Sequence, residues 1–166
     1  GILRNAGEYR KKEEPNEGAV YFGGREPQSC RMKYKGTHPN SIEEEVDEAF
    51  SLLVFEPNAD KKVIVRRATI YYLLFVRVHP FYDANGRVGR MIVSVYLYMH
   101  GYYLDWEDIN RKKGKFISKI NSCHDRADSV NENMKEKYRG YLVNFVMRRV
   151  ENHSEFYESD DEVDQN

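Results

Sequence analysis

Two long helical patterns, separated by a short polar segment, constrain the fold of this chain most. Residues 61–79 are apolar nearly all round a helix, which is typical of a helix at the centre of a fold. Pro80 disfavours helical geometry at His79, so this helix should end there. A second pattern covers residues 86–100, and Gly101 can cap its end. We therefore expect two packed central helices joined by a short loop. The apolar positions of the first include Val63, Val65, Ala68, Tyr71, Tyr72, Phe75 and Val76.

An earlier helix is predicted from its capping residues. Asn40 or Ser41 can cap its start, and Ser41 with Glu44 has the spacing of a capping box. Apolar residues then recur at helical spacing until Pro57 and Asn58, which should end the helix.

The remaining segments complete a mainly α fold. Short apolar pieces between glycines and prolines predict a β-hairpin over about residues 19–35. Helix-like patterns cover residues 106–123 and 131–150. The acidic tail over residues 151–166 is poor in aliphatic side chains, and we expect it to be disordered. The prediction is a helical bundle with a small β-hairpin, forming one domain over residues 1–150.

Composition excludes several classes of protein. The 166 residues suit a single domain, and a net charge of −1 argues against a protein built mainly to coat nucleic acid. No apolar run approaches the roughly 18 residues that a membrane helix needs. The start, GILRNAGEYR, lacks the basic and apolar parts of a signal peptide.

The beginning of the chain and its cysteines indicate its context. The sequence lacks an initiator methionine, so we expect that it is cut from something longer. Nothing marks it for export, which makes the cytoplasm the expected location and leaves delivery into a host cell open. Cys30 and Cys123 have no metal-binding spacing, and we expect reduced thiols, with a single disulfide as the alternative.

The polar segment between the two central helices carries the candidate chemistry. Unpaired N–H groups at a helix N-terminus bind anions. Ala84, Asn85 and Gly86 are small or turn-tolerant residues at such a position, so the backbone there can approach a phosphate closely. Arg87 and Arg90 are three residues apart, which puts two guanidinium groups on one helix face beside that anion site.

Three further residues complete this segment. A carboxylate at Asp83, beside bound phosphates, is suited to hold Mg²⁺. His79 titrates near neutrality and can take a proton from an attacking hydroxyl. Phe81 offers no chemistry, and we expect it to anchor the loop in the core.

Each of these residues has a simpler interpretation when taken alone. A histidine before a proline is usually structural, Asp and Asn in turns usually bond the backbone, and an arginine pair usually lies on a solvated face. Their conjunction within residues 79–90 favours a functional site.

The segment resembles the signature of the Fic (Fic/Doc) family, H-x-F-x-D/E-G/A-N-G-R-x-x-R. Pro80 also agrees with the commonest residue at its position, whereas glycine is more frequent than alanine at position 84. The family's helical core and upstream hairpin "flap" resemble the pattern of residues 1–150. The matching positions are His79, Phe81, Asp83, Ala84, Asn85, Gly86, Arg87 and Arg90.

The resemblance implies a protein adenylyltransferase, which moves AMP from ATP to a Ser, Thr or Tyr hydroxyl of a target protein and releases pyrophosphate. His79 would be the general base, and Asp83 would hold Mg²⁺ on the α- and β-phosphates. Asn85 and Gly86 would form the anion hole for the diphosphate. Arg87 and Arg90 would bind the β- and γ-phosphates.

The resemblance also suggests where the target and the adenine bind. The hairpin would take up a target segment by β-augmentation, with Tyr21 and Phe22 pressing on that segment or on the nucleotide. Their alternative role is ordinary hairpin packing. The adenine would lie near Phe116, which could stack on it, and Asn121, which could bond it. The basic run over residues 111–115 is interpreted as a solvated patch.

Regulation and donor choice stay open. Many Fic enzymes are restrained by a helix with the pattern S/T-x-x-x-E-G/N, which no Ser or Thr of this chain completes; Ser154, with Glu158 followed by Ser159, comes nearest. A separate inhibitory partner protein could supply that helix. The same fold could instead transfer UMP, phosphate or phosphocholine, although Gly86 argues against the kinase type. A non-catalytic nucleotide-binding or interaction module is the remaining alternative.

Overall fold

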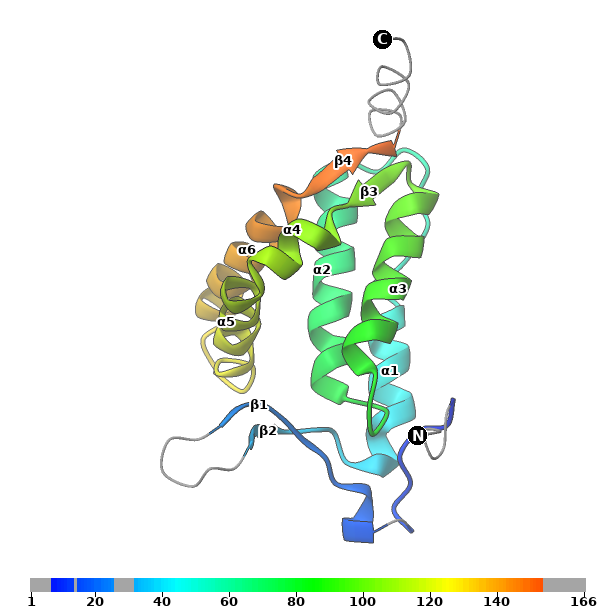
Figure 1. Ribbon diagram of the computed structural model, residues 1–166, viewed down its shortest axis with the longest axis vertical. Coiled ribbons are helices and arrows are strands. Elements are labelled where there is room, and N and C mark those ends of the chain that lie inside the picture. The colour runs from blue at the N-terminus through cyan, green and yellow to red at the C-terminus, as the bar shows by residue number, and fades with distance from the viewer. Residues whose placement is uncertain (1–6, 14, 26–31, 154–166) are drawn as a thin grey trace.

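The computed structural model describes residues 7–13, 15–25 and 32–153. Two long helices, α2 (Lys61–Val78) and α3 (Asn85–Met99), lie side by side at the centre (Figure 1). This confirms the mainly α fold with a small antiparallel strand pair. Around these two lie α1 (Ile42–Phe50), α4 (Trp106–Arg111), α5 (Lys113–His124) and α6 (Glu132–Met147).

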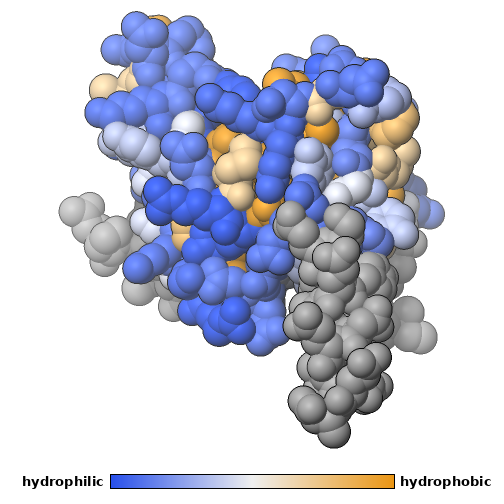
Figure 2. Space-filling model, turned by 90° about the horizontal axis from the view of Figure 1, so that it is seen from above, coloured by the Kyte–Doolittle hydropathy of each residue, from blue (hydrophilic) through white to orange (hydrophobic). Residues whose placement is uncertain are grey.

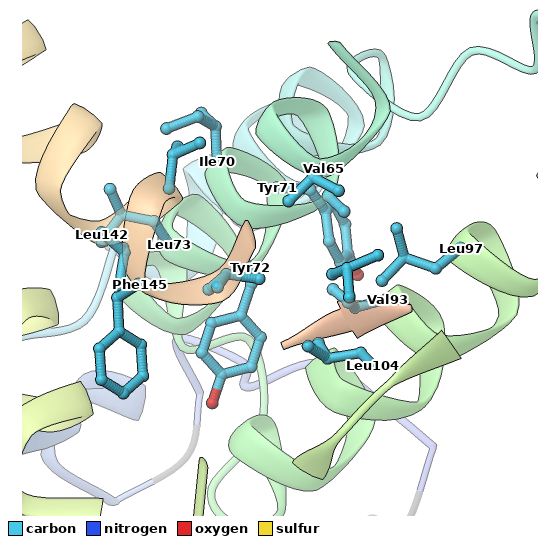
Figure 3. Packing of buried hydrophobic residues seen from close by; sticks show 14 of the residues in the cluster. Val65, Ile70, Tyr71, Tyr72, Leu73, Val93, Leu97, Leu104, Leu142 and Phe145 are labelled. Atoms are coloured by element: carbon cyan, nitrogen blue, oxygen red, sulfur yellow. The ribbon is translucent and has the colours of Figure 1, made fainter. Parts of the chain in front are cut away.

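Helix α2 is the centre of the core because it buries side chains on all sides. Figure 3 shows Val93 and Leu97 of α3 on one side of it, and Leu142 and Phe145 of α6 on the other. The Asp60 side chain caps its start by accepting a hydrogen bond from the backbone N–H of Lys62 at 2.7 Å. This packing explains why a helix with little amphipathic character is stable here.

The helix before α2 differs from the sequence prediction at both ends. Ser41 makes no side-chain cap bond, because a 3₁₀ turn over Pro39–Ser41 precedes α1. His38 caps this turn through its Nδ1 atom, 3.2 Å from the backbone nitrogen of Asn40. The helix ends at Phe50, well before Pro57, so the capping box and the predicted end were both wrong.

The hairpin forms where it was predicted. Strands β1 (Tyr21–Arg25) and β2 (Met32–Lys35) pair antiparallel, with Phe22 opposite Tyr34. The register is irregular between Phe22 and Arg25. Gly23 lies in this irregular stretch at φ 83°, and the Tyr34 ring occupies the space of a Cβ there, 2.4 Å from its ideal position. Only glycine fits both conditions.

A second strand pair was not predicted. Strands β3 (Tyr102–Leu104) and β4 (Val150–Asn152) pair antiparallel at the end of the molecule opposite the hairpin (Figure 1). The predicted start of the acidic tail at Glu151 therefore falls inside a strand. The segment from Trp106 to Cys123 is also two helices rather than one, because the backbone turns at Lys112 (φ −108°, ψ 26°).

The end of the molecule that carries β4 is shown in Figure 2. Hydrophilic residues dominate this face, and hydrophobic residues gather near its middle. Within the described ranges, no helix is long and apolar enough to cross a membrane. Cys123 is a buried free thiol, and Cys30 and the tail from Ser154 onward lie outside the described residues.

Candidate active site

The signature segment joins the C-terminus of α2 to the N-terminus of α3, at the end of the core that the hairpin approaches (Figure 1). His79 is the C-cap of α2 and adopts the left-handed conformation, with φ 54° and ψ 57°. Its backbone N–H bonds the carbonyl of Phe75 at 3.1 Å. This conformation turns the chain sharply out of the helix and toward the loop.

The His79 ring is held in a defined tautomer. Its Nδ1 atom lies 3.3 Å from the carbonyl oxygen of Val76. Because a carbonyl can only accept, Nδ1 must donate, and Nε2 then keeps the lone pair that a base needs. The ring of Phe22 from the hairpin stacks on the imidazole, with centroids 4.6 Å apart and planes 10° apart.

The surroundings of His79 favour the neutral imidazole. Burial is the main cause that lowers the pKa of His79 below its ordinary value, and the charge of Arg10 acts in the same direction. The Val76 carbonyl and the Asp83 charge oppose this shift. The balance leaves a base that is unprotonated at neutral pH, which is the form that can accept a proton.

Asn85 closes the loop instead of facing a ligand. It is 2% exposed, and its Oδ1 atom accepts from the Phe81 N–H at 3.0 Å while its Nδ2 atom donates to the Phe81 carbonyl at 2.8 Å. Phe81 in turn packs beside Tyr9 and Phe75, as expected of an anchor. The side chain of Asn85 is thus used within the loop, and its backbone N–H remains for an anion.

The N-terminus of α3 has the properties of an anion site. The first helical bond runs from the Val88 N–H to the Ala84 carbonyl at 2.9 Å. The N–H groups of Asn85, Gly86 and Arg87 therefore have no partner within the helix, as in any first turn. Ala84 itself is left-handed, with φ 66°, and this turns the chain into the helix.

The strained Ala84 gives a first testable prediction. A left-handed non-glycine residue costs about 1 kcal/mol, so Ala84→Gly should raise the free energy of unfolding by about that amount. Thermal denaturation should then show a melting temperature higher by about 2–4 °C. A melting temperature that stays the same or falls would show that the alanine methyl packs usefully there.

Asp83 and Arg87 form an exposed pair at the mouth of the site. The carboxylate accepts from the Ala84 N–H at 2.5 Å, and its other oxygen lies 3.3 Å from an Arg87 guanidinium nitrogen. The Asp83 and Arg87 side chains are 63% and 73% exposed, so the pair contributes little energy and can be exchanged for ligand contacts.

Arg90, by contrast, is held in place by side chains from another part of the chain. Its guanidinium donates to Asn110 Oδ1 at 3.0 Å and lies 5.3 Å from the centre of a Trp106 ring. Burial raises the pKa of the nearby Tyr72 hydroxyl, and Arg90 opposes this shift. Sequence reasoning missed Asn110, Trp106 and Tyr72, because only the tertiary fold brings them to the signature helix.

A magnesium ion would find one protein carboxylate here. Among the residues that the structure describes, no group of three or more His, Cys, Asp or Glu side chains could hold a metal on its own. Mg²⁺ commonly uses one or two carboxylates together with substrate phosphates. The exposed Asp83, next to the anion site, fits that use, so any ion held here would depend on a bound nucleotide.

The hairpin is fastened to α5 beside the site. The Tyr34 hydroxyl shares its one proton between Asp125 Oδ1 at 2.7 Å and the Asn121 carbonyl at 3.1 Å, and Lys33 pairs with the same Asp125. The ring of His124 packs edge-on against Phe22 and Tyr34, and burial lowers its pKa to about 4. These contacts place Phe22 over His79.

The other predicted ligand contacts differ in their placement. Tyr21 is 58% exposed on β1, and the Asn121 amide lies near Gly24 of the same strand. Phe116 does not reach the site. That ring is 2% exposed and packs in the core against Tyr72 and Phe145, which favours a packing role over the predicted stacking on an adenine.

The chain is similar to a known family and to individual known proteins. Residues 2–97, more than half of the chain, match the Fic/DOC family. A probable protein adenylyltransferase of Aquifex aeolicus (strain VF5) is 35% identical over 71 residues, which are 43% of this chain and 21% of that protein. A crystal structure of a Fic domain containing signalling protein from Bacteroides thetaiotaomicron VPI-5482 aligns over 86% of this chain and 52% of that one, with a TM-score of 0.53 and 19% identity. This chain thus spans about a fifth of the curated relative and about half of the solved one.

Proposed function

The chain belongs to the Fic/DOC family, and from that premise we propose that it is a protein adenylyltransferase, which moves AMP from ATP to a Ser, Thr or Tyr hydroxyl of a target protein. One observation carries the proposal. A neutral imidazole with a free Nε2 stands at the end of α2, next to the unpaired N–H groups that begin α3. A base and an anion site at adjoining helix ends suit attack of a hydroxyl on a phosphate.

The proposed reaction uses each part once. His79 Nε2 accepts the proton of the target hydroxyl as its oxygen bonds the α-phosphorus of ATP. The bond from that phosphorus to the bridging oxygen breaks, and pyrophosphate leaves with the electron pair. The first-turn N–H groups of α3, with Arg87 and Arg90, hold the phosphates and offset the charge that develops on them. Asp83 would hold a Mg²⁺ ion, whose charge would offset part of the charge of the phosphates.

The hairpin offers a place for the target. Tyr21 on β1 is exposed, and the hairpin's edge can accept a further strand. A segment bound there would lie beside Phe22 and His79. This arrangement supports a protein substrate, whose hydroxyl the strand pairing would align with the base.

Two glycines of α3 allow a paired test of the anion site. Among the residues that the structure describes, a Cβ on Gly86 would meet only the Tyr72 hydroxyl, at 3.7 Å, whereas a Cβ on Gly89 would lie 3.0 Å from the Tyr72 ring and 3.3 Å from Phe75. Gly89→Ala should therefore lower the free energy of unfolding by about 1–2 kcal/mol. Gly86→Ala should keep or slightly raise stability, because alanine favours helix, and should weaken ATP binding by crowding the phosphates.

The measurements are thermal denaturation and calorimetric titration with ATP and Mg²⁺. Each alanine serves as the other's control, since both lie on one helix and add one methyl group. Wild-type ATP affinity in folded Gly86→Ala would place the phosphates elsewhere.

The donor is tested by the position of the label. The protein is incubated with Mg²⁺ and a cell lysate, using ATP labelled with radioactive phosphorus at the α or at the γ position. Protein label from α-labelled ATP alone is the expected result. Label from the γ position would indicate phosphate transfer. If ATP binds without transfer of either label, UTP and CDP-choline are tested next, and failure of all donors would leave an interaction module.

A further inference from the structure

Arg10 is a buried arginine at the end of α2, outside the signature segment. Its side chain is 2% exposed, and its Nε atom donates to the His79 carbonyl at 2.8 Å. Its terminal nitrogens donate to the Val78 carbonyl at 3.2 Å, to the Thr37 carbonyl at 2.7 Å and to the Gly18 carbonyl. One guanidinium thus joins the catalytic loop to the segments on both sides of the hairpin.

The carbonyls of Val78 and His79, which accept from Arg10, lie at the C-terminus of α2. The last carbonyls of a helix have no partner within it, and that end carries partial negative charge. A buried cation there satisfies the carbonyls and suits the charge. The Arg10 guanidinium also bonds His79, which adopts the left-handed conformation. A non-glycine residue keeps that conformation only where its surroundings enforce it.

Backbone contacts reinforce the same junction. The Arg10 N–H bonds the Pro80 carbonyl at 3.0 Å, and the Thr37 N–H bonds the Val78 carbonyl at 3.1 Å. At Gly36 there is no room for a Cβ, which would lie 3.1 Å from an Arg10 nitrogen and 3.2 Å from the His79 Cβ. The segments that contain Arg10 and Thr37 therefore both contact the end of α2, beside His79.

We propose that Arg10 is a positioning residue, which fixes the backbone of His79 so that its imidazole reaches the proton of the target hydroxyl while the hydroxyl oxygen faces the α-phosphate. The role as base rests on the proposed function, but the positioning itself does not. Arg10 touches the His79 carbonyl and not the reacting atoms. The anion site is fastened separately, by Asn85 on Phe81, so loss of Arg10 should disturb the base and leave the phosphate site intact.

The test compares Arg10→Lys and Arg10→Gln with wild type. Displacement of a catalytic group by about 1 Å can lower the rate about 10²-fold, so kcat should fall by about 10- to 100-fold in Arg10→Gln. ATP affinity should stay within about two-fold, because the first turn of α3 is unchanged. Arg10→Lys keeps one donor and the charge, and should recover part of the rate.

The matched control is Thr69→Val, which removes a buried hydrogen bond from the same helix, between the Thr69 hydroxyl and the Val65 carbonyl at 2.7 Å. It should lower stability without changing kcat per folded molecule. If Arg10→Gln loses no more rate than this control at equal folded fraction, or if ATP affinity falls in parallel with kcat, Arg10 is only structural.

A readout independent of activity uses nuclear magnetic resonance of isotope-labelled histidine, with His79→Ala to assign the signal. In wild type the His79 ring protons should carry a ring-current shift from the stacked Phe22, and Nδ1 should be the protonated nitrogen. Both signatures should weaken in folded Arg10→Lys, which also serves if Arg10→Gln does not fold. Unchanged signals would overturn the positioning role even if no transfer reaction were ever observed.

Discussion

Replacing His79 with alanine should lower the rate of AMP transfer by about 10³-fold or more, with ATP affinity nearly unchanged. General base catalysis typically contributes about 10²- to 10⁴-fold, and the imidazole is the base that the geometry offers. The proposed phosphate site lies on the first turn of α3 and does not use the ring. The measurement is single-turnover transfer at saturating ATP, beside an ATP titration of the same variant.

The pH dependence provides a second check on His79. Because the pKa of His79 is lowered, mainly by burial, the neutral base persists below the ordinary value of 6.5. The acidic limb of kcat/KM against pH, which reports the free protein, should therefore lie below pH 6.5 and be absent from His79→Ala. An acidic limb above that value, or one that survives the substitution, would assign the base to another group.

Replacing Asn85 with aspartate should unfold or loosen the signature loop, which is the largest stability effect expected. The side chain is buried, and its amide nitrogen donates to the Phe81 carbonyl. A carboxylate of the same shape would place an oxygen against that carbonyl and bury an uncompensated charge. The free energy of unfolding should fall by about 3 kcal/mol, and the melting temperature by about 10 °C.

The control for Asn85→Asp is Asn144→Asp, the same chemical change on an exposed part of α6. That variant should melt within about 1 °C of wild type, because surface substitutions away from such features rarely change stability. Equal melting temperatures for both variants would contradict the loop closure by Asn85.

The sequence predicted the elements whose signals are local. The apolar patterns located α2, α3 and α6 to within a few residues, and Pro80 located the end of α2. The hairpin followed from its glycines. The signature segment identified the family, because its eight positions lie close together in the sequence and can be recognised without the tertiary fold.

What the sequence missed depends on residues distant in the chain. Strands β3 and β4 are three residues each and pair across almost fifty residues, so neither carries a recognisable pattern. The role of Arg10 depends on carbonyls up to 69 positions away. Phe116 is an aromatic residue in the segment where the adenine was predicted to bind. Only the packing of α5 against α6 shows that its ring lies in the core.

The central claim is that His79 and the start of α3 together transfer a nucleotide, and one comparison tests it most directly. Wild type and His79→Ala are each incubated with Mg²⁺, α-labelled ATP and a cell lysate, after titration has shown that both bind ATP. The expected result is labelled protein with wild type and none with the variant. Equal labelling by both proteins would contradict it, because the phosphate site would then act without the base.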